Sequence, residues 1–340
     1  MNAPIFVVGT PRSGTTLTAR ILGRHSGLFM PGETHFFDDI YARRQELGAP
    51  QEARAAAAIA TRLSTLYERF NEPNDQQRIQ ALGGAHALKQ LLGTSCRTYG
   101  DVLSRFMQFQ MHQYPTKVRW GNNVPKDIFY VKDILTFYPE AKFVICVRDI
   151  RDFLFSYQYQ WKKSSPEHTE RIKKLYHPIL TSLLWKAAMK QIRVAQALVP
   201  LDNLLIMRYE DLARQPEATI HTLCQFLKEP YEEEMLQVEA HNSSFDVQEQ
   251  GIFSTSIQRW RQHLDPDHIY IAERMARSEL HQLGYPPAHV QPNPLKLLYL
   301  TASFPYALCW ALHANRSIRG PMLPYLKRRI AAFFTSGKKT

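Results

Sequence analysis

The sequence predicts an α/β protein with a P-loop-like, doubly wound parallel sheet, helices on both faces of the sheet and a helical insertion. Three short apolar runs have the length of buried parallel strands, at residues 5–8, 143–147 and 204–207. Helical stretches separate these runs, and a Gly9-x-x-x-x-Gly14 loop follows the first of them. Alternation of strands and helices with a glycine-rich first loop is typical of a phosphate-binding domain.

The helices are expected between and after these strands. The first begins at the glycine-rich loop, and the Ala-rich stretch 51–70 and the stretch 81–114 belong to a helical insertion at about residues 41–117, which ends at Trp120-Gly121. The remaining helices are expected at residues 126–137, 151–163, 179–198, 217–227 and 266–283. The last helix ends at Gly284 before two prolines. The main domain should therefore cover residues 1–288, with a C-terminal extension at 289–340.

The first loop predicts a phosphate cradle. Its glycines let backbone N–H groups turn inward, and the following helix adds its positive dipole end. Nucleotide triphosphate sites of this type read G-x-x-x-x-G-K-[ST], with the Lys on the β- and γ-phosphates. Thr15 stands where that Lys should be, and Arg12 supplies a basic residue inside the loop. The pattern favours phosphate binding and disfavours kinases and GTPases.

A second charged group follows the run at residues 143–147. Arg148 comes directly after this strand, and Ser156 follows on the expected helix. Ligands of open α/β sheets bind outside the carboxyl ends of the strands, so an Arg and a hydroxyl here suit a second phosphate group. An ion pair between Arg148 and Asp149 that caps the junction of strand and helix is the alternative.

The formal net charge of +11 is concentrated at the C-terminus. No Asp or Glu occurs after Glu279, whereas eight basic residues do: Lys296, Arg316, Arg319, Lys327, Arg328, Arg329, Lys338 and Lys339. Such a tail suits an anionic membrane surface or nucleic acid, and a solvated basic extension explains it equally well. The membrane surface is retained as the expected partner, and no nucleic-acid partner is expected.

The cysteines and the first residues of the sequence indicate the cellular compartment of the protein. The four cysteines are far apart and form no C-x-x-C pair, which fits a reducing environment. The chain enters its first apolar run at once, without the charged and apolar regions of a secretory signal. We therefore expect a cytoplasmic protein.

Two motifs together resemble a known family. The run PRSGTTL at residues 11–17, followed by VRDIRDFLFSY at 147–157, resembles the sulfotransferases that use 3′-phosphoadenosine 5′-phosphosulfate (PAPS). The Arg-Tyr-Glu-Asp-Leu run at 208–212 and the Arg259-Trp260 pair also look like family features, so the resemblance covers about residues 4–285. The pattern is most similar to the branch with tyrosylprotein sulfotransferases and bacterial sulfotransferase-domain proteins, in which a Gly-Glu pair follows the cradle.

The resemblance implies a role for each matching residue. Glu33 matches the catalytic Glu, which would act as the general base. The 5′-phosphosulfate would be bound by Arg12, Ser13, Gly14, Thr15 and Thr16, and the 3′-phosphate by Arg148 and Ser156. Tyr209 and Arg259 match positions that contact the nucleotide, and Ser254 or Ser256 would join them. The scheme requires no metal ion.

The sequence departs from the family at two positions. Relatives carry a Lys-x-Pro motif whose Lys helps to neutralise the bridging oxygen, and this chain has Asn123-Val124-Pro125. Lys126 is predicted to replace that Lys, because its stem is long and flexible. Without it, Arg12 acts beside a neutral amide. Gln160 stands where some relatives place a further phosphate-binding Arg.

The residues after Glu33 admit several interpretations. His35, Asp38 and Asp39 resemble a metal cluster in composition, but their spacing follows no established ligand pattern, so no metal site is expected. His35 is expected to line the acceptor pocket or to orient Glu33. Phe36 and Phe37 are expected to pack in the core. The insertion at 41–117 is expected to shape the acceptor site.

An uncharged apolar stretch, interrupted by Pro305, occupies residues 297–314. A membrane-spanning helix needs about 20 mostly apolar residues, so a surface-bound segment flanked by basic residues fits better. A helical pair packed on the main domain is the alternative. A membrane-associated enzyme would suit a lipid or lipid-linked glycan acceptor.

The leading functional hypothesis is sulfuryl transfer from PAPS to a hydroxyl acceptor, on a saccharide, a lipid-linked saccharide or a protein tyrosine. Two alternatives remain open. One is a small-molecule kinase of the P-loop type, which Thr15 disfavours. The other is a catalytically silent nucleotide-binding module with a membrane-recruiting tail, which Asn123 keeps open.

Overall fold

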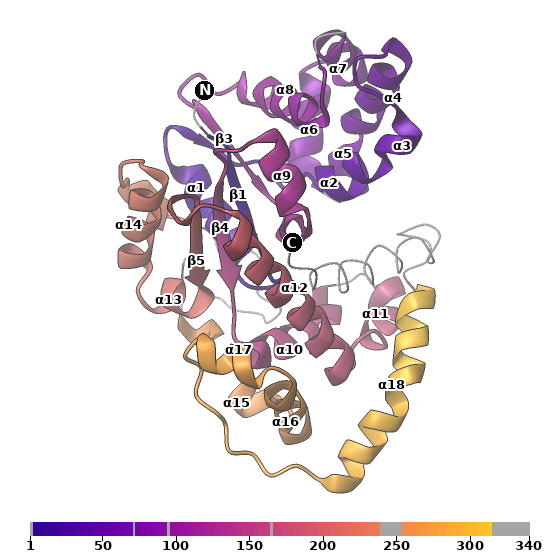
Figure 1. Cartoon of the computed structure of the whole chain (residues 1–340), viewed down its shortest axis with the longest axis vertical. Coiled ribbons are helices and arrows are strands. Elements are labelled where there is room, and N and C mark those ends of the chain that lie inside the picture. The colour runs from indigo at the N-terminus through magenta and orange to yellow at the C-terminus, as the bar shows by residue number, and fades with distance from the viewer. Residues whose placement is uncertain are drawn as a thin grey trace. The chain divides into compact units, whose positions relative to one another are not determined.

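A computed structural model describes residues 3–70, 72–93, 96–163, 166–238, 252 and 254–314. Within them, five strands form one sheet in the order β2-β3-β1-β4-β5, and every neighbouring pair is parallel. Figure 1 shows this sheet with helices around it. The strands are β1 (Ile5–Gly9), β2 (Leu28–Phe29), β3 (Arg119–Asn123), β4 (Lys142–Val147) and β5 (Leu204–Arg208). The predicted fold class and all three predicted strands are confirmed.

Two strands were not predicted, β2 and β3. β2 has only two residues, and β3 has the sequence RWGNN, which is not an apolar run. β3 is nevertheless fully buried, and the side chains of Arg119 and Asn122 have specific partners there. The Arg119 guanidinium, for example, donates hydrogen bonds to the carbonyl oxygens of Ala3 and Leu227. Trp120-Gly121, expected to end the insertion, therefore lies inside a central strand.

Alternate residues of β1 face opposite sides of the sheet. Ile5 and Val7 belong to an apolar core cluster that also includes residues of α1 (Thr15–Arg24), α13 (Tyr209–Arg214) and α14 (Pro216–Leu227). Phe6 lies among aromatic rings, with ring centroids 5.7 Å from Phe143 and 6.4 Å from Phe37. Burial on both faces is what the continuous apolar run predicted, since each face of a doubly wound sheet is covered.

The insertion between β2 and β3 is helical, as predicted, but more divided. Stretch 51–70 forms two helices, and stretch 81–114 is broken near Gly83 and Gly93, which adopt positive φ values of 98° and 38°. Glycine adopts a positive φ without steric cost, so a helix readily ends at such a residue. The helices of this segment are α2 (Phe36–Asp39), α3 (Arg44–Leu47), α4 (Ala53–Ser64), α5 (Leu66–Arg69), α6 (Pro73–Ala81), α7 (Gly84–Leu92) and α8 (Tyr99–Met111).

Further helices follow β3, β4 and β5. The predicted helix at 126–137 begins as the 3-10 helix η2 (Pro125–Tyr130), and the predicted helix at 266–283 is divided at Ala276. The remaining helices are α9 (Val131–Phe137), α10 (Ile150–Gln158), α11 (Pro166–Lys173), α12 (Pro178–Leu198), α15 (Trp260–His263), α16 (Pro266–Met275), α17 (Arg277–Gln282) and α18 (Pro294–Ala314).

The chain divides into two compact units. The first unit contains Met1–Val147, Ala195–Ala240 and Gln250–Ile252, and so holds the whole sheet and the insertion. The second unit contains Arg148–Val194, His241–Glu249 and Phe253–Thr340. The predicted boundary near residue 288 stays a prediction. The candidate residues fall into two groups, one in each unit.

Candidate functional site

The phosphate cradle lies between β1 and α1 in the first unit. Gly9 has φ 142°, and a Cβ there would lie 2.1 Å from the carbonyl oxygen of Cys146 in β4, so no other residue fits. Gly14 has φ 88° and precedes the first residue of α1. Between them, Arg12 has the left-handed value φ 64°. The loop therefore has the tight turn that directs backbone N–H groups toward an anion at the helix N-terminus.

Hydroxyl groups hold the cradle against the sheet. The buried Ser13 hydroxyl contacts the carbonyl oxygens of Thr10 and Cys146, the latter at 2.9 Å. Thr15 is buried as well, and the Thr18 hydroxyl donates to the carbonyl oxygen of Gly14 at 3.0 Å. The Ser13 hydroxyl thus points into the fold, and the role of Ser13 on the phosphosulfate stays a prediction. Thr16 is half-buried.

Tyr209 lies against the cradle. It is the first residue of α13, directly after β5, and a Cβ on Gly14 would lie 2.6 Å from Cδ2 of its ring. A tyrosine predicted to contact the nucleotide therefore lies beside the loop predicted to bind the phosphates. Gly14 is required here for two reasons, its positive φ and the close approach of this ring.

Glu33 lies on the loop that follows β2. Its Oε2 is 3.2 Å from Nε2 of His35, whose ring stacks on Phe70 of the insertion at a centroid distance of 4.0 Å. His35 has the left-handed value φ 47°, which is uncommon for a residue other than glycine. Such strain is often found at functional sites. The geometry agrees with the prediction that His35 orients Glu33.

The two aspartates after His35 have other partners. Oδ1 of Asp39 lies 2.5 Å from Arg62, and Oδ1 of Asp38 accepts a hydrogen bond from the Tyr130 hydroxyl at 3.0 Å. Phe36 and Phe37 are fully buried, as predicted. Asp39 therefore joins α2 to α4 within the insertion, and Asp38 joins α2 to η2.

Lys126 and Asn123 lie at the carboxyl end of β3. Asn123 is buried, and its Oδ1 has no hydrogen-bond partner among the described residues. Lys126 lies on η2, half-exposed, with its Nζ 3.9 Å from Oδ2 of Asp38. At 3.9 Å this ion pair is at the long end of the range for such contacts. Replacement of the family Lys by Lys126 stays a prediction.

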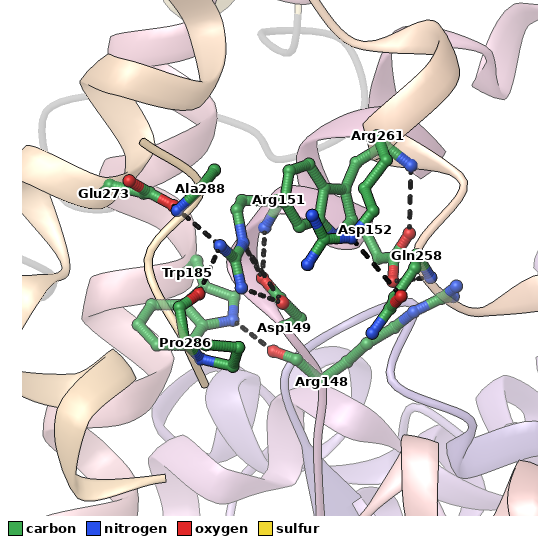
Figure 2. Close-up of polar contacts among 11 residues, drawn as sticks. Arg148, Asp149, Arg151, Asp152, Trp185, Gln258, Arg261, Glu273, Pro286 and Ala288 are labelled. Atoms are coloured by element: carbon green, nitrogen blue, oxygen red, sulfur yellow. Dashed lines mark hydrogen bonds and ion pairs between the residues drawn. The ribbon is translucent and has the colours of Figure 1, made fainter. Parts of the chain in front are cut away.

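Arg148 directly follows β4 and begins the second unit. Its Nη2 donates to the carbonyl oxygen of Ser256 at 2.7 Å, and its own carbonyl oxygen accepts from Nε1 of Trp185 at 3.0 Å. Figure 2 shows the Trp185 contact and the neighbouring Asp149. Asp149, the partner considered for Arg148 in the alternative interpretation, pairs with Arg151 and accepts a hydrogen bond from the Arg151 backbone N–H at the start of α10.

The buried side chain of Arg151 fixes the backbone next to Arg148. Its guanidinium makes hydrogen bonds to both carboxylate oxygens of Asp149, to Glu273 and to the carbonyl oxygen of Pro286, and it stacks over Trp260. Figure 2 shows Arg151 between Asp149 and Glu273. Only 1% of the side chain is exposed. Since paired buried charges fix one geometry, this network holds the backbone on which Arg148 is mounted.

The segment 254–260 is held by α10. Asp152 accepts hydrogen bonds from the backbone N–H groups of Gln258 at 2.8 Å and Trp260 at 3.4 Å. Asp152 therefore fixes the segment that carries Ser256 and Arg259. This segment belongs to the second unit, as do Arg148 and Ser156. Ser156 is buried on α10, and Nε of Arg259 donates to the carbonyl oxygen of Thr255 at 2.6 Å. The side chain of Ser254 lies outside the described residues.

Sequence reasoning missed two carboxyl groups near Glu33. Burial, with a smaller contribution from Glu33, raises the pKa of Glu72 above its usual range. Burial, and then Asp38 and Glu33, raise the pKa of Asp127 well above its usual range. Asp127 follows Lys126 directly, and Glu72 comes from the insertion, so neither belongs to a recognisable motif. Only the folded chain reveals that their charges interact with that of Glu33.

The comparisons with known proteins agree with this geometry. The profile of the sulfotransferase family matches residues 4–233. The 3-alpha-hydroxysteroid sulfotransferase of Cavia porcellus is 26% identical over 120 residues, which are 35% of this chain and 42% of that protein. Sulfotransferase 2A6 of Rattus norvegicus is 29% identical over 126 residues, with the same coverage. The chain spans less than half the length of these curated relatives.

Solved structures show the same fold. The sulfotransferase domain from the curacin biosynthetic pathway has a TM-score of 0.55 at 20% identity, covering 84% of this chain and 99% of that domain. The sulfotransferase domain from the Synechococcus PCC 7002 olefin synthase has a TM-score of 0.50 at 22% identity, covering 81% and 96%. Because the family profile covers most of the chain and the fold agrees, this protein belongs to the sulfotransferase family.

Proposed function

We propose that the protein transfers the sulfuryl group of PAPS to a hydroxyl acceptor, with Glu33 as the general base. One observation carries the proposal, the placement of Glu33 and the cradle at the same edge of the sheet. Asn122 of β3 accepts a hydrogen bond from Thr34, the neighbour of Glu33, and β3 pairs directly with β1, which leads into the cradle. A carboxylate beside a phosphate cradle suits base-assisted group transfer.

In this mechanism the acceptor hydroxyl oxygen forms a bond to sulfur, and the bond from sulfur to the oxygen of the 5′-phosphate breaks. The carboxylate of Glu33 takes the hydroxyl proton as the new bond forms. The products are a sulfate ester and adenosine 3′,5′-bisphosphate, which keeps the electron pair of the broken bond. His35 keeps the Glu33 carboxylate in one orientation through the contact at 3.2 Å.

Charge that develops on the leaving oxygen needs donors that are already in place. The backbone N–H groups of the cradle and the Arg12 guanidinium provide them in this proposal. Lys126 is proposed as the additional cation, in place of the family Lys at Asn123. The scheme uses no metal ion.

The nucleotide end of PAPS is assigned to the second unit and to Tyr209. Arg148 and Ser156 are proposed to bind the 3′-phosphate, and Arg259 with Ser254 or Ser256 to contact the nucleotide. The buried Arg151 network supports this assignment, because it fixes the backbone on which Arg148 is mounted. A fixed guanidinium is well suited to a phosphate group.

The acceptor is proposed to be a saccharide or a lipid-linked saccharide, with a protein tyrosine as a further hydroxyl acceptor. The insertion contributes Phe70 and Glu72 beside the Glu33 loop, which supports its predicted role in shaping the acceptor site. An aromatic ring next to a general base suits a sugar face or a phenol ring.

We also propose that α18 attaches a cytoplasmic enzyme to the surface of an anionic membrane. Among the described residues α18 is one helix that is long and apolar enough to cross a membrane, although a single such helix is weak evidence of spanning. Most of its exposed residues are apolar or aromatic and recur at helical spacing: Leu295, Leu298, Tyr299, Ala302, Pro305, Tyr306 and Cys309. Thr301 and His313 are exposed polar residues of the same helix. An exposed apolar face with aromatic residues suits the interface of a bilayer.

The opposite face of α18 is attached to the second unit. Lys296 pairs with Asp265 and Asp267, and Ser303 lies 3.3 Å from Nε2 of His177. The structure contains one continuous helix here, so the alternative of a helical pair is wrong for residues 294–314. The basic residues Arg316, Arg319, Lys327, Arg328, Arg329, Lys338 and Lys339 lie outside the described residues, and their attraction to anionic lipid stays a prediction.

The nucleotide assignment is tested by thermal unfolding. Adenosine 3′,5′-bisphosphate should raise the melting temperature more than ATP with Mg²⁺ at equal concentration, because at a given concentration the ligand with the lower Kd for the folded protein stabilises it more. Equal or greater stabilisation by ATP with Mg²⁺ would favour the kinase alternative. Stabilisation by the bisphosphate without any sulfuryl transfer would favour the silent module.

A further inference from the structure

The hydroxyl of Thr34 makes two hydrogen bonds beside Glu33. It donates to Oδ1 of Asn122 at 2.7 Å, and it accepts from the backbone N–H of Phe36 at 3.3 Å. Thr34 is fully buried. The two bonds fix the backbone on both sides of His35, the residue with the left-handed conformation.

The interaction continues from Asn122 to Asp127. Nδ2 of Asn122 donates to Oδ2 of Asp127 at 2.7 Å, and both side chains are fully buried. The three side chains therefore form one continuous chain of hydrogen bonds, from the Glu33 loop through β3 to η2. This three-residue chain has no solvent-exposed member.

A chain of buried polar side chains stabilises a core less than apolar side chains would. Buried polar groups cost free energy unless they are hydrogen-bonded, and Oδ1 of Asp127 has no hydrogen-bond partner among the described residues. An apolar strand of ordinary composition would pack β3 without this cost. Polar groups that lower stability in this way tend to serve a functional site.

We propose that Thr34, Asn122 and Asp127 are positioning residues that hold the Glu33 carboxylate in its reactive orientation. The proposal rests on the proposed role of Glu33. Thr34 acts on its neighbour through the backbone, and Asn122 connects Thr34 to the rigid end of β3. His35 supplies the side-chain half of the same restraint, 3.2 Å from Glu33.

Asp127 fits this role as a neutral group. Burial raises its pKa well above the ordinary range, and the neighbouring carboxylates of Asp38 and Glu33 add to the effect, against the Asn122 hydrogen bond and Lys126. A neutral carboxyl accepts the Asn122 hydrogen bond without placing another negative charge beside Glu33. The isosteric amide of Asp127→Asn should therefore preserve the chain.

The test compares Thr34→Val with Thr34→Ser. Valine keeps the shape and removes both hydrogen bonds, so turnover should fall by about 10-fold or more, with the affinity for adenosine 3′,5′-bisphosphate unchanged. Serine should restore turnover to within about 3-fold, since it keeps the hydroxyl. Thr61→Val is the matched control, because the exposed Thr61 hydroxyl bonds only within α4. Equal turnover of the Val variant and the wild type would overturn the proposal.

A double-mutant cycle distinguishes the positioning of Glu33 from general damage to the fold. If Thr34 acts through Glu33, then Thr34→Val should have little further effect in the Glu33→Gln background, because the loss has already occurred. Losses that multiply would overturn the proposal and assign Thr34 a structural role independent of Glu33.

An independent measurement does not need activity. In full-length protein, amide hydrogen exchange at residues 33–36 should be about 10-fold faster in Thr34→Val and near wild type in Thr34→Ser. If the wild type transfers no sulfuryl group, the proposed function fails. The exchange rates still show whether the hydrogen bonds of Thr34, Asn122 and Asp127 fix the Glu33 loop. Unchanged exchange in Thr34→Val would overturn the proposed chain whatever the activity.

Discussion

Nε2 of His35 lies 3.2 Å from Oε2 of Glu33, and the same imidazole stacks on Phe70 of the insertion. One side chain thus joins the proposed general base to the segment proposed to shape the acceptor site. The base is held by a group that the insertion itself supports. The first prediction concerns this pair.

Glu33→Gln should lower turnover by about 10²- to 10⁴-fold, because the amide cannot take the acceptor proton. His35→Phe keeps an aromatic ring on Phe70 but removes the nitrogen, so its loss should be smaller, about 10-fold. Both variants should bind adenosine 3′,5′-bisphosphate like the wild type, measured by titration calorimetry. Full turnover in Glu33→Gln would show that another group is the base.

Arg148→Ala should have the opposite profile. Loss of a charged hydrogen-bond donor should weaken binding of adenosine 3′,5′-bisphosphate by about 10- to 100-fold, with a smaller effect on turnover at saturating PAPS. Arg261→Ala is the control, since Arg261 stacks on the outer side of Trp260 and bonds only Gln258. Equal weakening in both variants would mean that general positive charge, and not a 3′-phosphate site, binds the nucleotide.

Lys126 and Asn123 decide how the family Lys is replaced. If Lys126 acts on the leaving oxygen, Lys126→Ala should lower turnover far more than nucleotide affinity, and Asn123→Lys should change little. Lys126 lies directly after the Asn123-Val124-Pro125 segment, with its Nζ 3.9 Å from Oδ2 of Asp38. Acceleration of the wild-type reaction by Asn123→Lys, with no effect of Lys126→Ala, would show that the site works without this cation.

Asp127→Asn should stabilise the protein at neutral pH. A carboxyl whose pKa is raised in the folded state binds its proton more tightly there than in the unfolded chain, whose ordinary value is 3.8. Below pH 3.8 the carboxyl is protonated in both states, so Asp127 does not lower the free energy of unfolding there. As the pH rises from 3.8 toward the folded pKa of Asp127, the free energy of unfolding falls. Urea unfolding should show equal stability of the two proteins in acid and a more stable variant at neutral pH. A less stable variant at neutral pH would contradict this charge state.

Membrane attachment is predicted to depend on the exposed face of α18. Leu298→Glu and Tyr306→Glu place charges on side chains that are 67% and 73% exposed, so folding should be unaffected while binding to phosphatidylserine vesicles falls. Thr61→Glu adds the same charge to the exposed surface of α4 and should bind like the wild type. A wild type that ignores such vesicles at low salt would show that α18 has another partner.

Local patterns in the sequence predicted the cradle and three strands, because an apolar run and a glycine loop are formed by neighbouring residues. β3 could not be predicted in this way. Its Arg and Asn side chains are buried only because Ala3, Leu227, Thr34 and Asp127 supply partners from distant segments. Glu72 and Asp127 were missed for the same reason, since tertiary packing alone brings them near Glu33.

The orientation of the candidate side chains could not be predicted from the sequence. Ser13 lies in the cradle as predicted, yet its hydroxyl faces Cys146 and the sheet, which no linear pattern reveals. Arg148 follows β4 as predicted, its guanidinium donates to the carbonyl oxygen of Ser256, and the adjacent Asp149 pairs with Arg151. Spacing identifies candidate groups, whereas competition among neighbours decides their partners.

The central claim is sulfuryl transfer from PAPS, and it is tested most directly with radiolabelled sulfur. PAPS labelled in the sulfuryl group should transfer the label to octyl glucoside or N-acetyltyrosine amide, with release of adenosine 3′,5′-bisphosphate in equal amount and without added metal. Glu33→Gln, folded and still binding the bisphosphate, should lose this transfer. Transfer of the γ-phosphate of ATP to the same acceptors, with no transfer of labelled sulfur, would contradict the account.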